Sequence, residues 1–286
     1  MRAIAVIPES HRIEVEGCGI HYLRWGRRGL PGLVLVHGGA AHAHWWSFLA
    51  PLLNASHDVV ALDLSGHGDS HRRSVYTREL WAREVIEVAH AAGFAAPPIV
   101  IGHSLGGLVA IVAASLWGIE LAGAILVDSP VDKPSPDGGA APVDRKPGPA
   151  KTYLDRESAI KRFRLIPEEP IVNPFIIDHI ARHSVRQVDG GYTWKFDPAI
   201  LRRVSDDSMR HHLTRIRCRV ALLRGEHSVI MPPETAAYMV EQLSRSAPLV
   251  EIPEAYHHLF LQQPLAFVAA IRALLSDWQH SIPLTR

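Results

Sequence analysis

The segment at residues 99–107 constrains the fold of this chain more than any other feature of its sequence. It joins an apolar strand, a Gly-x-Ser-x-Gly turn and a helix of small and apolar residues. A strand that reverses directly into a helix strains the backbone at the apex, and Gly102 and Gly106 leave room for that turn. The turn presents the Ser104 hydroxyl clear of the sheet and aims the amide of Leu105 at the group that Ser104 attacks. The pattern therefore favours a nucleophilic serine over a structural turn.

Apolar runs and helical stretches alternate on both sides of this turn. Strands are predicted at residues 32–36, 59–64, 99–103, 123–127, 219–225 and 249–252, and the runs at 32–36, 59–64 and 123–127 are typical of buried strands. Helices are predicted to begin at residue 45 and to cover 77–92, 105–117, 234–243 and 264–278. This alternation predicts an α/β fold with a mostly parallel central sheet and helices on both faces. Two short alternating segments around Gly17-Cys18-Gly19 predict an antiparallel hairpin at one edge.

The alternation stops between residues 130 and 215, where a Pro/Gly-rich stretch leads into amphipathic segments. We therefore divide the chain into the first part of an α/β core at 1–129, an insertion at 130–215 and the second part of the core at 216–286. The 286 residues are ample for one large buried core. A small hairpin is predicted within the insertion at 185–196.

Three candidate site residues follow predicted parallel strands, namely Gly39, Ser104 and Asp128. Parallel sheets bind ligands beyond the carboxyl ends of their strands, so these residues are expected to meet at one edge. Glycine at position 39 lets a backbone amide approach a ligand closely, and Gly39 and Leu105 are therefore the predicted pair of oxyanion donors. A plain strand-to-helix turn is the alternative interpretation of the glycines after the first of these strands.

The order and spacing of these motifs resemble those of the α/β-hydrolase superfamily over almost the whole chain apart from the insertion. The matching motifs are, in chain order, the oxyanion segment His37-Gly38-Gly39, the Asp-x-x-Gly-x-Gly-x-Ser loop from Asp63 to Ser70, the elbow from Gly102 to Gly106, and the C-terminal histidine His257 followed by Leu259, Leu261 and Pro264. The insertion falls where the family carries a mainly helical lid. Four aromatic residues of that lid are predicted to contact an apolar substrate: Phe163, Phe175, Tyr192 and Trp194.

The resemblance implies a catalytic triad in which His257, rather than its neighbour His258, is the general base. The family's acid usually follows the penultimate strand by two or three residues, but the segment there reads Gly225-Glu226-His227-Ser228. Two carboxylates are left as candidates, Asp128 and Glu226. We favour Asp128, because some relatives use the position after the strand that follows the elbow helix.

These residues imply a serine hydrolase that cleaves a carboxylic ester or thioester of a small hydrophobic substrate through an acyl-enzyme on Ser104. A cofactor-independent oxygenase or a carbon–carbon bond hydrolase with the same Ser/His/Asp set is the alternative. A third possibility is a non-catalytic receptor on the same fold. A dehalogenase or an epoxide hydrolase would need an aspartate at the position of Ser104.

Composition excludes several other classes of function. A formal net charge of +1 gives no electrostatic footprint for nucleic acid or an anionic membrane, and no run is long enough to span a bilayer. The two distant cysteines and the short N-terminal apolar run predict a cytoplasmic protein, whose oligomeric state the sequence leaves open. We expect no cofactor and no metal, because the histidines in His42-x-His44 and His211-His212 lack a third partner at metal spacing.

Overall fold

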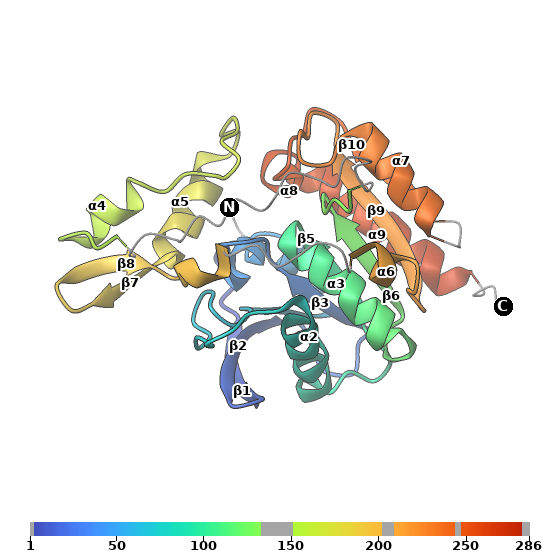
Figure 1. Cartoon of the computed structure of the whole chain (residues 1–286), viewed down its shortest axis with the longest axis horizontal. Helices are drawn as coiled ribbons and strands as arrows, with labels where there is room; N and C mark the ends of the chain where they lie inside the picture. The colour runs from blue at the N-terminus through green and yellow to red at the C-terminus, as the bar shows by residue number, and fades with distance from the viewer. Residues whose placement is uncertain (1–2, 133–150, 202–208, 244–246, 282–286) are drawn as a thin grey trace.

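The computed structural model describes residues 3–132, 151–201, 209–243 and 247–281. Within them an eight-stranded sheet has the order β1-β2-β4-β3-β5-β6-β9-β10 (Figure 1). Its strands are β1 (Glu9–Val15), β2 (Cys18–Trp25), β3 (Gly32–Val36), β4 (Asp58–Leu62), β5 (Ile99–His103), β6 (Gly123–Val127), β9 (Arg219–Gly225) and β10 (Leu249–Ile252). The hairpin β1–β2 joins the sheet antiparallel to β4, and the other pairings are parallel. The predicted α/β fold with its antiparallel edge is confirmed.

Helices cover both faces of the sheet. One face carries α2 (Arg78–Ala92), α3 (Leu105–Leu116), α6 (Met209–Leu213) and α7 (Pro233–Gln242). The other face carries α1 (Ala50–Leu53), α8 (Leu259–Gln262) and α9 (Pro264–His280), together with the 3-10 turn η1 (Ala43–Trp46). A second 3-10 turn, η2 (Gly118–Glu120), follows α3. No described helix is both long and apolar enough to cross a bilayer.

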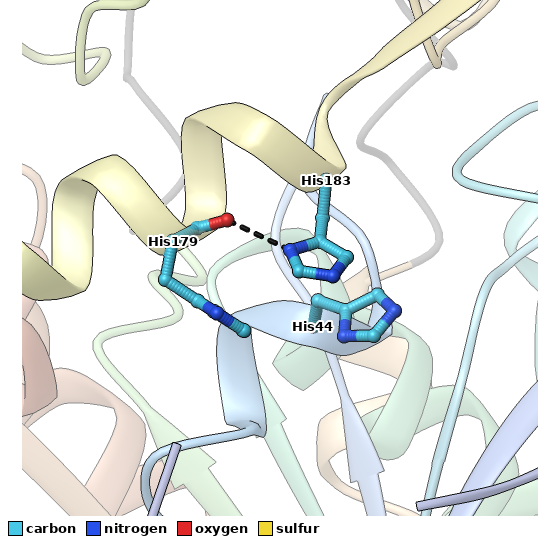
Figure 2. A group of neighbouring side chains, drawn as sticks. All are labelled: His44, His179 and His183. Carbon is cyan, nitrogen blue, oxygen red and sulfur yellow. Dashed lines mark hydrogen bonds between the residues drawn. The ribbon is translucent and has the colours of Figure 1, made fainter. Parts of the chain in front are cut away.

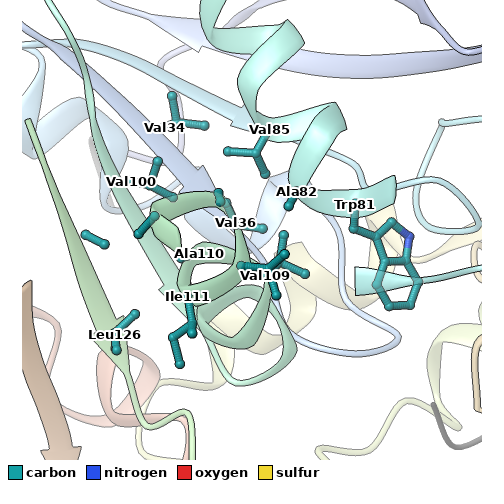
Figure 3. Packing of buried hydrophobic residues seen from close by; sticks show 14 of the residues in the cluster. Val34, Val36, Trp81, Ala82, Val85, Val100, Val109, Ala110, Ile111 and Leu126 are labelled. Atoms are coloured by element: carbon teal, nitrogen blue, oxygen red, sulfur yellow. The ribbon is translucent and has the colours of Figure 1, made fainter. Parts of the chain in front are cut away.

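Alternate residues of each central strand enter opposite cores. Val34 and Val36 of β3 pack beneath α2 and α3, as Figure 3 shows, whereas Leu33 and Leu35 pack on the opposite face. All four side chains are almost fully buried. Burial of each such side chain contributes about 1.5–3 kcal/mol relative to exposure. This two-sided burial explains why the central strands are continuous apolar runs in the sequence.

The described part of the insertion forms a lobe beside the sheet (Figure 1). It contains α4 (Arg156–Ile160), α5 (Pro174–His183), the hairpin of β7 (Val185–Val188) and β8 (Gly191–Trp194), and the 3-10 turn η3 (Pro198–Leu201). A small apolar core lies inside it, formed by Ala159, Ile160, Ala181 and Val185 with Tyr153, Phe163, Tyr192 and Trp194 packed around them. The helix α6 falls within the predicted range 130–215 but packs on α3 of the core.

The lobe is attached to loops that follow the C-terminal ends of parallel strands. After β3, His42 Nε2 lies 2.8 Å from the Ser184 hydroxyl. After β4, the amide of Gly68 donates to the carbonyl of Lys195 at 2.7 Å. After β10, the amide of His257 donates to a carboxylate of the lobe. The described part of the insertion therefore lies over the edge of the sheet where the candidate site residues gather.

The segment after β3 differs from its prediction. A regular helix beginning at Trp45 is not formed; the chain makes η1 and then the short helix α1. Trp45, Trp46 and Phe48 are all buried, so the run has no polar face that could lie on the surface of a longer helix. The helix after Thr77 agrees with its prediction, because the Thr77 hydroxyl accepts a hydrogen bond from the amide of Leu80.

Candidate active site

Ser104 stands at the apex of a strained turn between β5 and α3. Its φ is +52°, a backbone conformation that a residue with a side chain rarely adopts. A Cβ at Gly102 would lie 2.2 Å from the carbonyl oxygen of Gly106, so glycine alone fits there. The amide of Ser104 donates to the carbonyl of Val127 at 2.9 Å, which fixes the turn beside the end of β6. This is the geometry expected of a nucleophile elbow.

Strained backbone is concentrated around this turn. The described residues other than glycine with a positive φ are Glu16, Ala40, Ser104, Asp128 and Glu254, and all except Glu16 follow parallel strands at the same edge of the sheet. A single residue held in this conformation costs about 1–3 kcal/mol, and such strain persists where the surrounding structure enforces it, often at functional sites.

His257 is bound to Asp128. The Nδ1 atom of His257 lies 2.7 Å from Oδ2 of Asp128, and both side chains are almost fully buried. Asp128 also accepts hydrogen bonds from the amide of Gly225 at 3.1 Å and from the Ser228 hydroxyl at 2.5 Å. With its Nδ1 proton held by the carboxylate, the neutral His257 ring keeps its lone pair on Nε2. No described hydrogen bond joins that ring to Ser104, a contact that often forms only when substrate binds.

The other candidate acid, Glu226, lies elsewhere. Its side chain is 41% exposed and accepts a hydrogen bond from the amide of Glu254 at 2.9 Å. Ser228, two residues further on, stands where the family usually carries its acid and instead donates to Asp128. Sequence reasoning passed over Ser228 because it is not a carboxylate.

Glu169 and His103 hold the loop that carries His257. Glu169, from the insertion, accepts hydrogen bonds from the amides of His257 and His258, from His258 Nδ1 and from Gln262 Nε2. Burial would raise the pKa of Glu169, but the hydrogen bonds from His258 and the amides outweigh it and hold that pKa below its usual value. On the other side, His103 Nε2 donates to the carbonyl of His257 at 3.0 Å. Sequence alone gave no signal for Glu169.

The glycines after β3 lie over the elbow. A Cβ at Gly38 would stand 3.3 Å from the Cβ of Ser104, and one at Gly39 would stand 4.0 Å from a methyl group of Leu105. His37 supports this loop, because its Nδ1 donates to the carbonyl of Gly38 and its Nε2 accepts from the amide of Leu64. Burial lowers the pKa of His37, which is consistent with this neutral hydrogen-bonding pattern. Gly39 and Leu105, the two residues predicted to supply the oxyanion donors, are thus neighbours.

The four aromatic residues predicted to contact substrate fall into two places. Phe163, Tyr192 and Trp194 belong to the small core of the insertion. From there Phe163 faces Trp45, whose ring centroid in turn lies 5.5 Å from that of His258. Phe175 is separate from this group, is 45% exposed and lines a cavity on α5. Phe163 therefore connects the small core of the insertion, through Trp45, to the His257 loop, and Phe175 lies apart from these contacts.

Three clusters of described side chains have the composition of a metal site. The first consists of His21, Asp63 and Asp69. In it, Asp63 accepts hydrogen bonds from His21 Nδ1 and from the amides of Ala43 and Asp69, so it fastens loops together. Burial would raise the pKa of Asp63, but the hydrogen bond from His21 outweighs it and the pKa lies well below its usual value. The second cluster, Glu226 with His227 and Glu254, is exposed. The third consists of histidines alone and is described separately.

Comparisons with known proteins cover most of the chain. Residues 33–271 match the model of a family described as the alpha/beta hydrolase family. The pimeloyl-[acyl-carrier protein] methyl ester esterase of Neisseria meningitidis serogroup A is 30% identical over 264 residues, covering 86% of this chain and 78% of that protein. An esterase of Mycobacterium tuberculosis is 24% identical, covering 94% and 90%. The solved thioesterase domain from the curacin biosynthetic pathway has a TM-score of 0.80 at 21% identity, covering 93% of this chain and 100% of that domain.

Proposed function

Because this chain belongs to the alpha/beta hydrolase family, we propose that Ser104 is the nucleophile with which it hydrolyses carboxylic esters. The contact between His257 Nδ1 and Asp128 Oδ2, 2.7 Å long and shielded from water, carries this proposal more than any other. It leaves His257 Nε2 as the basic atom, on a loop that His103 holds beside the elbow. Ser104, His257 and Asp128 are thus the proposed triad.

In the first half of the reaction, Ser104 Oγ attacks the ester carbonyl carbon and its proton passes to His257 Nε2. Asp128 accepts a hydrogen bond from the Nδ1–H of the imidazolium that forms and offsets the charge of that ring. The amides of Gly39 and Leu105 donate to the oxyanion of the tetrahedral intermediate. His257 then gives its proton to the departing alkoxide, and the acyl group stays on Ser104.

In the second half, His257 takes a proton from a water molecule, which attacks the acyl-enzyme. The same amides stabilise the second tetrahedral intermediate. When it collapses, Ser104 recovers its proton from His257 and the free acid leaves. Asp128 keeps its hydrogen bond with His257 Nδ1 throughout, and the hydrogen bonds from Gly225 and Ser228 hold its carboxylate in place.

We further propose that the insertion at 130–215 is a lid that selects a small hydrophobic substrate. Support comes from its attachment to loops at the carboxyl edge of the sheet and from the aromatic path from Phe163 through Trp45 to the His257 loop. The relative from Neisseria acts, by its name, on a methyl ester. Methyl esters and thioesters of acids of graded chain length are therefore the substrates to compare.

The test is Ser104→Ala, assayed with p-nitrophenyl acetate and with the graded methyl esters. Loss of the nucleophile is expected to lower kcat by about 10⁵-fold or more with the fold retained, because the triad acts as a unit. Ser56→Ala, in an exposed loop, is the matched control and should keep the wild-type rate. Wild-type turnover by a folded Ser104→Ala protein would refute the proposal. Oxygen uptake by the wild type with a heteroaromatic enol, in the absence of ester turnover, would instead indicate the oxygenase alternative.

A further inference from the structure

Three histidines from distant parts of the chain meet where the insertion joins the core (Figure 2). His179 and His183 lie one turn apart on α5, so their side chains leave the same face of that helix. His44 comes from η1, after the glycine loop that follows β3. The ring centroid of His183 is 3.8 Å from that of His44 and 4.3 Å from that of His179. One nitrogen from each ring lies within 4.8 Å of one from each of the others.

The hydrogen bonds around these rings leave lone pairs within the cluster. His183 Nδ1 donates to the carbonyl of His179 at 2.9 Å, which leaves the lone pair of that ring on Nε2. His44 Nδ1 lies 3.1 Å from the Ser47 hydroxyl, and the tautomer of that ring decides which of its two nitrogens carries the lone pair. His179 Nε2 is shielded from solvent and has no hydrogen-bond partner within the described parts of the chain. A buried polar atom of this kind calls for a ligand or another explanation.

The charges near the cluster are balanced. Arg182, between the two α5 histidines, is paired with Asp178 and Glu157. Lys195 is paired with Asp69. A cavity of about 260 Å³, lined by His179, His183 and Asp178 among others, gives an ion a path to the rings.

We propose that His44, His179 and His183 bind one divalent transition-metal ion, with Zn²⁺ the best match, and that a water molecule from the adjoining cavity completes a tetrahedral site. This site is separate from the proposed triad and does not depend on the role of Ser104. Because α5 belongs to the insertion and η1 to the core, the ion would fasten one to the other.

The cluster already brings the three ring nitrogens near one another. Nitrogen ligands about 2.0–2.1 Å from a tetrahedral Zn²⁺ stand about 3.4 Å apart, and these nitrogens lie within 4.8 Å of one another. The rings of His44 and His183, whose planes are 31° apart, must rotate away from each other before both lone pairs can meet at one ion. The backbone on both sides of the site is already held, because His42 and Ser184 are hydrogen-bonded across the same junction. The bond from His183 to a carbonyl is also the kind of outer contact that orients a metal-binding histidine.

The experiment is a titration of the protein, freed of any polyhistidine tag and stripped with chelator, with Zn²⁺ alone by calorimetry. One ion per chain is expected, with a rise in Tm of several degrees, since an ion that binds only the folded chain stabilises it. His179→Gln and His183→Gln should each weaken binding by about 100-fold or more. His211 is an exposed histidine on α6, and His211→Gln is the matched control, which should bind Zn²⁺ as the wild type does.

Wild-type protein that binds no Zn²⁺, or His179→Gln and His183→Gln proteins that bind it as tightly as the wild type, would overturn the proposal. Two measurements on the wild type decide the matter if these variants fail to fold. Bound Co²⁺ should give the visible absorption bands of a tetrahedral nitrogen-ligated ion. A crystal soaked in Zn²⁺ should give an anomalous peak among the three rings, and a peak elsewhere alone would count against the site.

Discussion

His257 and the cluster of His44, His179 and His183 use the same side chain in two different ways. At the end of the sheet, the Nδ1 of His257 is bound to a buried carboxylate that the Gly225 amide and the Ser228 hydroxyl hold in place. In the cluster, the Nδ1 of His183 meets a carbonyl and the Nδ1 of His44 meets a hydroxyl, both uncharged. A carboxylate stabilises the protonated imidazolium, whereas a neutral acceptor leaves a neutral ring with its lone pair directed elsewhere.

The difference teaches that the partner of Nδ1 decides what a histidine can do. In the proposed mechanism His257 gains and loses a proton, and Asp128 offsets the charge. In the cluster, the described hydrogen bonds of His183 and His44 are with uncharged groups, and a nitrogen of each ring lies near those of the other two. The predictions that follow alter the surroundings of individual histidines in order to break or sharpen this contrast.

The largest effect is expected from Asp128→Asn, which replaces the charge beside His257 with a neutral amide. Turnover of p-nitrophenyl acetate should fall by about 10³-fold or more with little change in KM, because the charge is needed mainly in the transition state. Glu226→Gln is the matched variant, and it should lose less than about 10-fold because the described contacts of its exposed carboxylate are with Glu254 and His227, not with His257. The reverse ranking would assign the acid to Glu226, and two small effects would mean that neither carboxylate orients His257.

A smaller effect is expected from Glu169→Gln. The amide cannot accept all four hydrogen bonds that the carboxylate accepts, so the His257 loop should lose part of its order. We expect kcat to fall by about 10-fold with KM within about two-fold, a split typical of a positioning residue. The neighbouring Glu168 is exposed, and Glu168→Gln is the control. Equal kinetics for the two variants would show that the loop does not need Glu169.

The smallest effect concerns a histidine that burial alone keeps neutral. Burial lowers the pKa of His67 to about 3, while the unfolded chain keeps the ordinary value near 6.5. Below about pH 6.5 the unfolded chain therefore binds a proton that the folded chain does not, and the free energy of unfolding falls as pH falls. The slope reaches about 1.4 kcal/mol per pH unit for one histidine.

Urea unfolding of the wild type and of His67→Gln at pH 7.5, 6.5 and 5.5 measures that slope. The variant should lose less stability than the wild type between pH 6.5 and 5.5, whatever its stability at pH 7.5. His211→Gln, at an exposed position, is the control and should show the same loss of stability with pH as the wild type. Parallel curves for the wild type and His67→Gln would contradict the neutral state assigned to His67.

Much of the fold could be predicted because its signals are local. The strands β3, β6, β9 and β10 occupy the predicted residues. For β3 and β6 the signal is a continuous apolar run, which a strand buried on both faces requires. Thr77 marked the start of α2 through its capping hydroxyl. The elbow around Ser104 was recognisable because only glycine fits at positions 102 and 106. Each of these features lies within about ten residues of sequence.

The remaining contacts join residues that are far apart in sequence. Glu169 and His257 are 88 positions apart, and Ser228 and Asp128 are 100 apart, so no local pattern links them. The sequence also gave His44 no third partner, because His179 and His183 reach it only through the packing of the insertion on the core. Such pairs depend on how distant segments pack, whether the insertion on the core or the end of β9 beside the end of β6, and hydrophobic periodicity does not encode this packing.

The role of His257 as the base for Ser104 is tested most directly by the site and rate of labelling with a p-nitrophenyl phosphonate. Wild-type protein should gain one phosphonyl group, found by mass spectrometry on the peptide that carries Ser104, and Asp128→Asn should react about 10³-fold more slowly. A label on another residue, or equal rates for the two proteins, would contradict the assignment of Ser104, His257 and Asp128 as one catalytic unit.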